Sequence, residues 1–371
     1  MVIKRLNLVN FRNYGKVNLE LGPSMNIFIG ENASGKTNIL ESIVVLALTK
    51  SYKNINENNL IRIDKKKSKI KGTVKNNKSL KNLEIEIMET GKAVKINSKR
   101  VYCLADYISN LNIVLFTPDD LELIKGSPSI RRNLLNMELS QLSSLYLNTY
   151  NQYNKILRTR NEYLKILFTN NIADKKYLDI LTEQLIDKAI VIYKLRNEYL
   201  ENINKNINSI FKNITGEENL SILYKTNISF SNYEDDCLKK TMKEILNKNY
   251  QRELHIGMTL FGPHRDDFQF RLNDVDMKLF SSQGQQKSAV LAYKLSTIPI
   301  FEEKNGTKPV LLLDDIFSEL DLKKKNRLLK YVNQDIQSII TTTDLKNISK
   351  KSLENATIFK VSNGNVERSN N

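Results

Sequence analysis

The stretch GENASGKT, residues 30–37, decides the fold of this chain. It matches the pattern G-x-x-x-x-G-K-[ST], follows the apolar run MNIFI at 25–29, and opens a helical pattern from Lys36 to Leu48. A strand, a glycine-rich loop and a helix in this order form the phosphate-binding loop (P-loop) of nucleotide-hydrolysing proteins. Because a plain glycine-rich turn rarely has both flanks, the stretch predicts a nucleotide site on an α/β fold.

Each position of the loop has an expected chemical role. The backbone N–H groups of Asn32 to Lys36 would hold the phosphates, and the Lys36 ammonium would reach the β and γ phosphates. The Thr37 hydroxyl would bind Mg²⁺, and glycines at 30 and 35 let the backbone approach without a Cβ. The predicted nucleotide-binding residues are Gly30, Glu31, Asn32, Ala33, Ser34, Gly35, Lys36 and Thr37.

A P-loop needs an acidic residue at the end of a neighbouring strand, and PVLLLDD at 309–315 supplies two after an apolar run. We expect Asp314 to hold the Mg²⁺ and Asp315 to orient and deprotonate the attacking water. The other interpretation is a strand-end turn. A strand-end turn would leave the P-loop without a metal partner, because no other acidic residue follows an equally good strand.

A helical segment separates these two halves of the nucleotide site. From about residue 129 to 212 the chain has almost no Gly or Pro and spaces its apolar residues by three and four, as in Leu139, Leu142 and Leu145. The sequence therefore predicts an ATPase head formed by residues 1–125 and 216–371, with a helical lobe at 126–215 inserted into it.

The stretch SSQGQQ, residues 281–286, has a helix N-terminus signal in Ser282 and Gln285, which stand at capping-box spacing. A well-capped core helix explains it fully, but a helix start can also hold a phosphate. Since the P-loop already covers the phosphates of its own nucleotide, a second helix start of this kind is best used on another molecule's nucleotide. This favours a composite site that is closed by dimerisation.

Composition narrows the class of partner. Lys and Arg exceed Asp and Glu to give a net charge of +16, which favours polyanionic partners. The basic run at 62–81 is either a DNA contact or a solvated face. The N-terminus has no signal-peptide pattern and the apolar runs are too short for a bilayer, so we expect a cytoplasmic protein without membrane association. Cys103 and Cys237 form neither a disulfide framework nor a zinc pattern.

Seven motifs in this order resemble the RecF family of recombination-repair ATPases, whose ABC-type heads are related to those of SMC proteins. The motifs are NFRNY, GENASGKT, FTPDDLELIKGSPSIRR, FGPHRDD, SSQGQQKS, LLLDDIFSELD and TTTD. The resemblance implies a P-loop ABC-type ATPase head, with a mixed sheet and flanking helices, that is interrupted by a helical lobe. It also implies ATP as the nucleotide.

The resemblance assigns further residues. Ser282, Gln283, Gly284, Gln285 and Gln286 would form the ABC signature that contacts the partner's γ-phosphate, and Ser318 to Asp321 would be the D-loop. Arg12 would approach the nucleotide, although an ordinary surface arginine is an equal alternative.

The sequence departs from general ABC heads in two places. Thr343 stands where the switch histidine is expected, and Thr117-Pro118-Asp119-Asp120 stands where a glutamine normally follows the strand. The FGPHRDD motif is expected to line the site or the dimer face. A metal role for His264 with Asp266 is less favoured than a turn held by Pro263.

The expected function is that of an ATP-gated DNA-binding protein. ATP would close a head-to-tail homodimer on double-stranded DNA near single-strand gaps, and slow hydrolysis would reopen it. By resemblance, RecR is the partner and RecA loading is the outcome. Two alternatives stay open at this point: a P-loop kinase of a small acceptor, which would not need SSQGQQ, and the ATPase subunit of a membrane transporter, which would normally keep the switch histidine.

Overall fold

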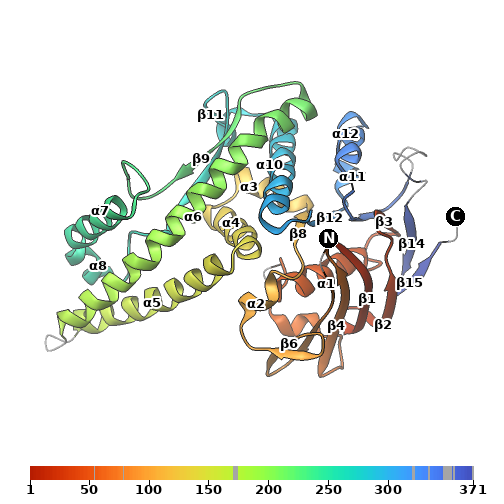
Figure 1. The fold of residues 1–371 in the computed structure, drawn as a ribbon, viewed down its shortest axis with the longest axis horizontal. Coiled ribbons are helices and arrows are strands. Elements are labelled where there is room, and N and C mark those ends of the chain that lie inside the picture. The colour runs from red at the N-terminus through yellow and green to blue at the C-terminus, as the bar shows by residue number, and fades with distance from the viewer. Residues whose placement is uncertain are drawn as a thin grey trace. The chain divides into compact units, whose positions relative to one another are not determined.

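The computed structural model describes residues 1–53, 55–77, 79–169, 174–319, 322–332, 335–345, 353 and 356–369. The chain forms two compact units, drawn in Figure 1. The head unit comprises Met1–Leu121, Ser209–Glu218 and Gln283–Asn371, and the lobe unit comprises Glu122–Asn208 and Asn219–Ser282. The main difference from the predicted domains is that residues 219–282 belong to the lobe unit rather than to the head.

A mostly parallel sheet forms the centre of the head unit. In the described part of the chain its order is β15-β14-β3-β13-β12-β8, and only β15 is antiparallel to its neighbour. Its strands are β3 (Met25–Ile29), β8 (Ile113–Phe116), β12 (Val310–Asp314), β13 (Ser338–Thr342), β14 (Thr357–Ser362) and β15 (Asn365–Arg368). β3, β8 and β12 are mainly apolar runs because they are buried on both faces, and β13 (SIITT) is equally buried but carries three hydroxyl side chains.

A second, antiparallel sheet of the head has the order β2-β1-β4-β5-β6-β7 among the described residues. Its strands are β1 (Val2–Phe11), β2 (Tyr14–Glu20), β4 (Lys67–Lys75), β5 (Leu80–Met88), β6 (Gly91–Ile96) and β7 (Lys99–Val101). Side chains along β4 alternate between buried and exposed, as expected for a sheet with one solvated face.

The helix that follows the P-loop, α1 (Lys36–Leu48), contacts both sheets of the head. It lies beside β1 and β4 in Figure 1. Every residue from Ile39 to Leu48 is buried, because a helix enclosed on two sides has no solvent face. Gly72 on β4 permits the close approach, since a Cβ there would lie 2.3 Å from the Leu46 side chain.

The head contains further helices besides α1. They are η1 (Glu57–Leu60), α2 (Leu104–Ile108), η2 (Pro118–Leu121), α10 (Gln283–Asn305), α11 (Ile316–Glu319) and α12 (Leu322–Val332). α10 begins inside the SSQGQQ stretch and packs on β8 and η2. The predicted D-loop, Ser318 to Asp321, lies outside the residues whose side chains the structure describes.

The lobe unit is mainly helical and contains a small antiparallel sheet of order β11-β10-β9. Its elements are α3 (Glu122–Lys125), α4 (Pro128–Leu142), α5 (Ser144–Thr169), most of α6 (Lys175–Thr215), β9 (Leu220–Lys225), α7 (Asp235–Lys248), α8 (Tyr250–Ile256), β10 (Asp267–Leu272), β11 (Val275–Asp276) and α9 (Met277–Phe280). β10 contacts α4 and α8 contacts α5, which explains why 219–282 joins this unit. Within the described ranges, no helix combines the length and the apolar character needed to cross a bilayer.

Candidate nucleotide-binding site

The P-loop connects β3 to α1 and adopts a conformation that favours glycine. The backbone is left-handed at Ala33 (φ +63°) and Gly35 (φ +113°), which turns successive N–H groups toward one side of the loop. A Cβ at Gly35 would lie 2.6 Å from Asn13 Nδ2, and one at Gly30 would lie 2.3 Å from the Val361 carbonyl oxygen. Both glycines of the motif are therefore required by the local packing.

The Lys36 side chain curves back over the loop. Its Nζ donates hydrogen bonds to the carbonyl oxygens of Gly30 and Glu31, both at 2.7 Å. Burial lowers the pKa of the Lys36 ammonium, while the carboxylates of Asp315 and Asp314 act in the opposite direction. The cation is thus held at the mouth of the loop, close to both acidic residues of the neighbouring strand.

Asp314 ends β12 and receives hydroxyl donors from two other elements. Thr37 Oγ1 donates to Asp314 Oδ1 at 2.9 Å, and Thr341 Oγ1 donates to the same oxygen at 2.7 Å. The parallel register places Asp314 opposite Thr341 on β13. The structure therefore brings Thr37 and Asp314 together, as the sequence predicts, although they come from opposite ends of the chain.

Asp315 has a left-handed backbone, with φ +49°. Its N–H donates to Thr341 Oγ1 at 3.0 Å. A cavity of about 160 Å³ joins the P-loop to the two carboxylates. It is lined by Asn32, Ala33, Gly35, Lys36, Thr37, Asn38, Asp314, Asp315 and Thr341.

Two supporting residues of this site lie in the NFRNY motif. Tyr14 Oη donates to the Gly35 carbonyl oxygen at 2.9 Å, and Asn13 Nδ2 donates to the Ser34 carbonyl oxygen at 3.4 Å. Asn38 on α1 donates to Asn13 Oδ1 at 2.9 Å. The NFRNY motif by itself does not indicate this role, which only the spatial approach of the β1–β2 turn to the P-loop reveals.

Arg12, in the same turn, pairs with a carboxylate on α1. Its Nε and Nη2 donate to the two Glu41 oxygens at 2.9 and 2.8 Å, and its Nη1 donates to the Asn59 carbonyl oxygen at 2.9 Å. Glu41 is fully buried. Arg12 is not among the residues that line the cavity, so its predicted approach to the nucleotide stays a prediction.

Tyr52 is a further neighbour of the acidic strand that no motif indicated. Its hydroxyl donates to Asp314 Oδ2 at 3.4 Å. Burial raises the pKa of Tyr52, and the nearby charges of Asp314 and Glu41 raise it further. The tyrosine therefore stays a neutral donor at physiological pH.

The signature residues stand apart from this cavity. Ser282, Gln283 and Gly284 are exposed, and Gln286 is buried at 3% exposure. Gln285 Nε2 donates to Glu217 Oε2 at 2.8 Å, which ties the start of α10 to the segment after α6. Of the cavity-lining residues, none comes from 282–286.

The two places where the sequence departs from general ABC heads have local structures of their own. Asp120 accepts hydrogen bonds from the Thr117 N–H at 2.8 Å and from the buried Lys294 ammonium of α10 at 2.6 Å. This ion pair fastens the turn after β8 to the signature helix. Thr343 is exposed just after β13.

The basic run at 62–81 is partly neutralised by its neighbour in the sheet. Lys69 and Lys71 on β4 pair with Glu84 on β5 at 3.2 and 2.9 Å, and Lys67 pairs with Glu86 at 3.4 Å. Lys65 and Lys66 precede β4 and are exposed. The ion pairs with β5 therefore neutralise part of this run, and Lys65 and Lys66 lie just before the paired segment.

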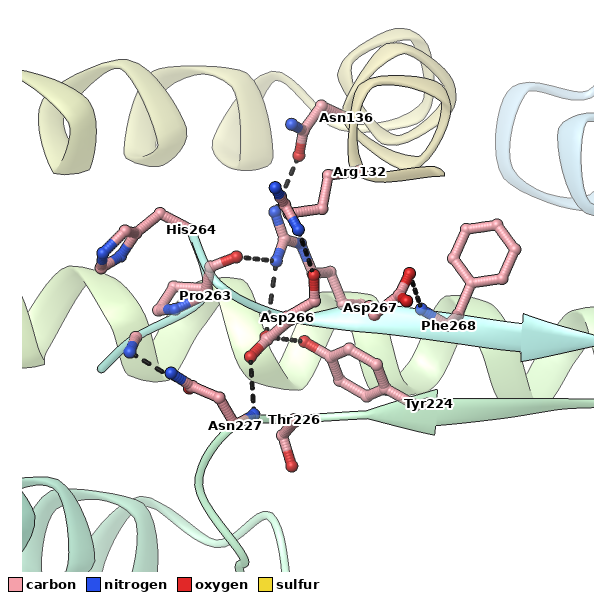
Figure 2. Close-up of polar contacts among 12 residues, drawn as sticks. Arg132, Asn136, Tyr224, Thr226, Asn227, Pro263, His264, Asp266, Asp267 and Phe268 are labelled. Carbon is pink, nitrogen blue, oxygen red and sulfur yellow. Dashed lines mark hydrogen bonds and ion pairs between the residues drawn. The ribbon is translucent and has the colours of Figure 1, made fainter. Parts of the chain in front are cut away.

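The FGPHRDD motif, residues 261–267, lies in the core of the lobe unit. Figure 2 shows Asp266 between Tyr224 and the backbone of Asn227, which donate to it at 2.6 and 3.3 Å. Arg132 donates to its carbonyl oxygen at 2.7 Å. The His264 ring points away from Asp266 and bonds Tyr153 Oη at 2.6 Å, so the two residues do not face a common metal position.

This cluster predicts two opposing pH effects on stability. Burial raises the pKa of Asp266 to about 6, so its contribution to the free energy of unfolding falls as pH rises from 4 to 6. Burial lowers the pKa of His264 to about 4, so its contribution rises from pH 4 to 6.5. Each amounts to about 3 kcal/mol, and in the intact protein they largely cancel.

Single substitutions should separate the two effects. The unfolding free energy of Asp266→Asn minus that of the unmodified protein should increase by about 3 kcal/mol from pH 4 to 6. The reason is that the variant lacks the Asp266 contribution, which falls over this pH range. His264→Gln should show a decrease of similar size from pH 4 to 6.5. Urea unfolding followed by circular dichroism measures both, and a flat difference for either variant would contradict the assignment.

Comparisons with known proteins identify the family. The model of the RecF/RecN/SMC N terminal domain matches residues 2–367. The DNA replication and repair protein RecF of Listeria welshimeri serovar 6b is 40% identical to this chain, and the alignment covers 100% of each protein. The RecF of Staphylococcus haemolyticus is 39% identical, over 99% of this chain and 100% of that protein.

Solved structures agree with this assignment. A structure of the recombination mediator protein RecF with ATPrS has a TM-score of 0.91 at 34% identity, over 99% of this chain and 98% of that one. An SMC head bound to the C-winged helix domain of ScpA has a TM-score of 0.57 at 16% identity, over 100% and 97% of the two chains, and shares the fold alone. This chain belongs to the RecF family of DNA replication and repair proteins.

Proposed function

We propose that this chain is an ATP-gated DNA-binding protein of recombinational repair, in which ATP closes a head-to-tail homodimer and slow hydrolysis reopens it. The observation that carries the proposal is the 160 Å³ cavity in which the P-loop, Lys36, Thr37 and both acidic residues meet. Such a cavity suits the triphosphate of a nucleotide. The relative solved with ATP supports ATP as that nucleotide.

Within this site the residues divide the chemistry. The loop N–H groups and the Lys36 ammonium bind and orient the β and γ phosphates and stabilise the negative charge that develops there. Asp315 lies one residue beyond Asp314 at the wall of the cavity. It orients the attacking water and accepts its proton.

The residues also fit the Mg²⁺ that accompanies ATP. Adjacent oxygen ligands of an octahedral Mg²⁺ at about 2.1 Å are separated by about 3 Å. Thr37 Oγ1 and Asp314 Oδ1 are 2.9 Å apart, and both are oxygen donors of the kind that Mg²⁺ prefers. Thr37 and Asp314 would hold the ion, which neutralises phosphate charge when bound.

The location of the predicted signature supports the proposed dimer. Ser282, Gln283 and Gly284 are exposed at the start of α10 and are absent from the cavity of their own chain. The first turn of a helix attracts phosphate through the direction of its N–H groups and the positive end of its dipole. We therefore assign residues 282–286 to the γ-phosphate of ATP bound to a second copy.

The proposed DNA partner is double-stranded DNA near single-strand gaps. The net charge of +16 supports a polyanionic partner, and the relatives are DNA repair proteins. The related structure belongs to the RecFOR pathway, which supports RecR as the protein partner and RecA loading as the outcome. We therefore also propose that the protein acts in the cytoplasm, where bacterial DNA lies.

Ser282→Arg tests the composite site. The variant should bind ATP as a monomer but should not dimerise, because the added side chain blocks phosphate from the start of α10. Gel filtration with and without a non-hydrolysable ATP analogue measures this, and Ser109→Arg, at another exposed serine, is the matched control. Normal dimerisation of Ser282→Arg would assign this helix start a capping role only.

Joint replacement of Lys65, Lys66 and Lys67 by alanine tests the DNA contact. The affinity for DNA should become less dependent on salt. The slope of log K against log salt should decrease in magnitude by about 2 to 3 if all three residues contact phosphates. ATP binding should not change. The control is joint replacement by alanine of three exposed lysines of the lobe unit, Lys155, Lys165 and Lys240, which removes the same charge. An equal change of slope in both variants would show that residues 65–67 have no special role in DNA binding.

A further inference from the structure

We infer that Leu279 and Phe280 form an apolar anchor that packs against a second copy of this chain when ATP closes the dimer. The inference rests on the proposed function. Leu279 is 70% exposed and Phe280 is 74% exposed. Adjacent large apolar side chains this exposed are costly in water unless another surface covers them.

The lobe unit presents these two side chains on a fixed support. Asp276 caps α9 by accepting a hydrogen bond from the Lys278 N–H at 2.8 Å. Met277, the first residue of α9, is 1% exposed and anchors the turn beside β10. Ser281 Oγ donates to the Met277 carbonyl oxygen at the other end. The outward position of Leu279 and Phe280 therefore results from a built turn with an internal anchor.

Chain connectivity places the pair next to the proposed dimer contact. Consecutive Cα atoms are about 3.8 Å apart, so the Cα of Phe280 lies within about 7.6 Å of the Cα of Ser282. Ser282 opens the helix start whose positive dipole end complements the phosphates of a second copy's ATP. A protein surface that delivers ATP to Ser282 therefore comes within reach of the exposed Phe280 side chain.

The chemistry of the pair favours a protein surface over DNA. A phosphodiester backbone offers no apolar surface to a leucine, whereas buried aromatic and aliphatic anchors are the main energetic contacts of protein interfaces. Two chains of net charge +16 also repel each other on approach. Burial of four apolar side chains across a symmetric dimer offsets part of that repulsion.

The test is the double variant Leu279→Ser with Phe280→Ser in the full chain. With a non-hydrolysable ATP analogue, sedimentation equilibrium should show a dimer dissociation constant raised by about 100-fold or more, because hot-spot side chains are lost. Affinity of the monomer for the analogue should be unchanged. Phe280→Leu keeps an apolar side chain and should retain most of the dimer.

The matched control is Ile256→Ser with Met258→Ser, a half-exposed apolar pair of the same unit. It should leave the dimer constant unchanged. If the unmodified chain stays monomeric with the analogue, both the proposed dimer and this inference fail. If the unmodified chain and the Leu279/Phe280 variant dimerise equally, only the inference fails. If they dimerise equally but the variant has lost affinity for DNA, then DNA covers the two side chains, and the inference is likewise overturned.

Discussion

Replacement of Lys36 by alanine is expected to lower ATP affinity by about 100-fold or more, because the β and γ phosphates lose a charge-assisted contact. The Lys36 ammonium lies 2.7 Å from two carbonyl oxygens of the P-loop, so it is already positioned at the phosphate site. Isothermal titration with ATP and Mg²⁺ measures the loss.

The fold should survive this change. Lys36 Nζ bonds two backbone carbonyl oxygens at the mouth of the loop, and water in the adjoining cavity can replace these hydrogen bonds when the side chain is removed. Lys16→Ala, at an exposed lysine of the same unit, is the control and should bind ATP normally. Unchanged ATP affinity in Lys36→Ala, with an unchanged melting temperature, would contradict the assigned site.

Asp315→Asn should lower the single-turnover rate of ATP hydrolysis by about 10² to 10⁴-fold while ATP binding persists, because the amide cannot accept the proton of the attacking water. Asparagine is the correct substitution. Asp315 has φ +49°, a left-handed conformation that Asn tolerates and that alanine would adopt only with strain. A loss of activity can then be assigned to the missing base rather than to the backbone.

The partner variant Asp314→Asn separates the two carboxylates. It should raise the Mg²⁺ concentration needed for ATP binding, since Asp314 shares an oxygen contact with Thr37. ATP-dependent dimers should accumulate in Asp315→Asn and become scarce in Asp314→Asn. Equal loss of ATP affinity in both variants would show that the proposed division of roles is wrong.

The sequence was sufficient for features that depend on local order along the chain. GENASGKT has its strand before it and its helix after it, and LLLDD has its acidic pair at a strand end. In each pattern the functional residues are neighbours in the sequence and their flanking elements are adjacent, so one sequence is enough to predict the fold of the head. The comparisons confirm that prediction.

Features that depend on contacts between distant segments could not be predicted. No local pattern indicates that Tyr52 reaches Asp314, that Tyr14 bonds Gly35, or that Glu84 neutralises two lysines of the basic run. The strands at 220–225 and 267–272 have the same alternation that head strands would have, so their membership of the lobe unit becomes visible only through their packing. These contacts depend on which distant segments pack together in the fold, and the residue types along the sequence do not specify that.

The arrangement of the parallel sheet sets an order of events during synthesis. β3 (Met25–Ile29) hydrogen-bonds β13 and β14, which the ribosome makes about 300 residues later, roughly 15 to 60 seconds at bacterial elongation rates. The lobe unit is contiguous between 122 and 282 except for one short segment, so it can fold first. The strand that precedes the P-loop therefore cannot form its native pairs until β13 and β14 have been made, and its apolar side chains lack their native cover during synthesis.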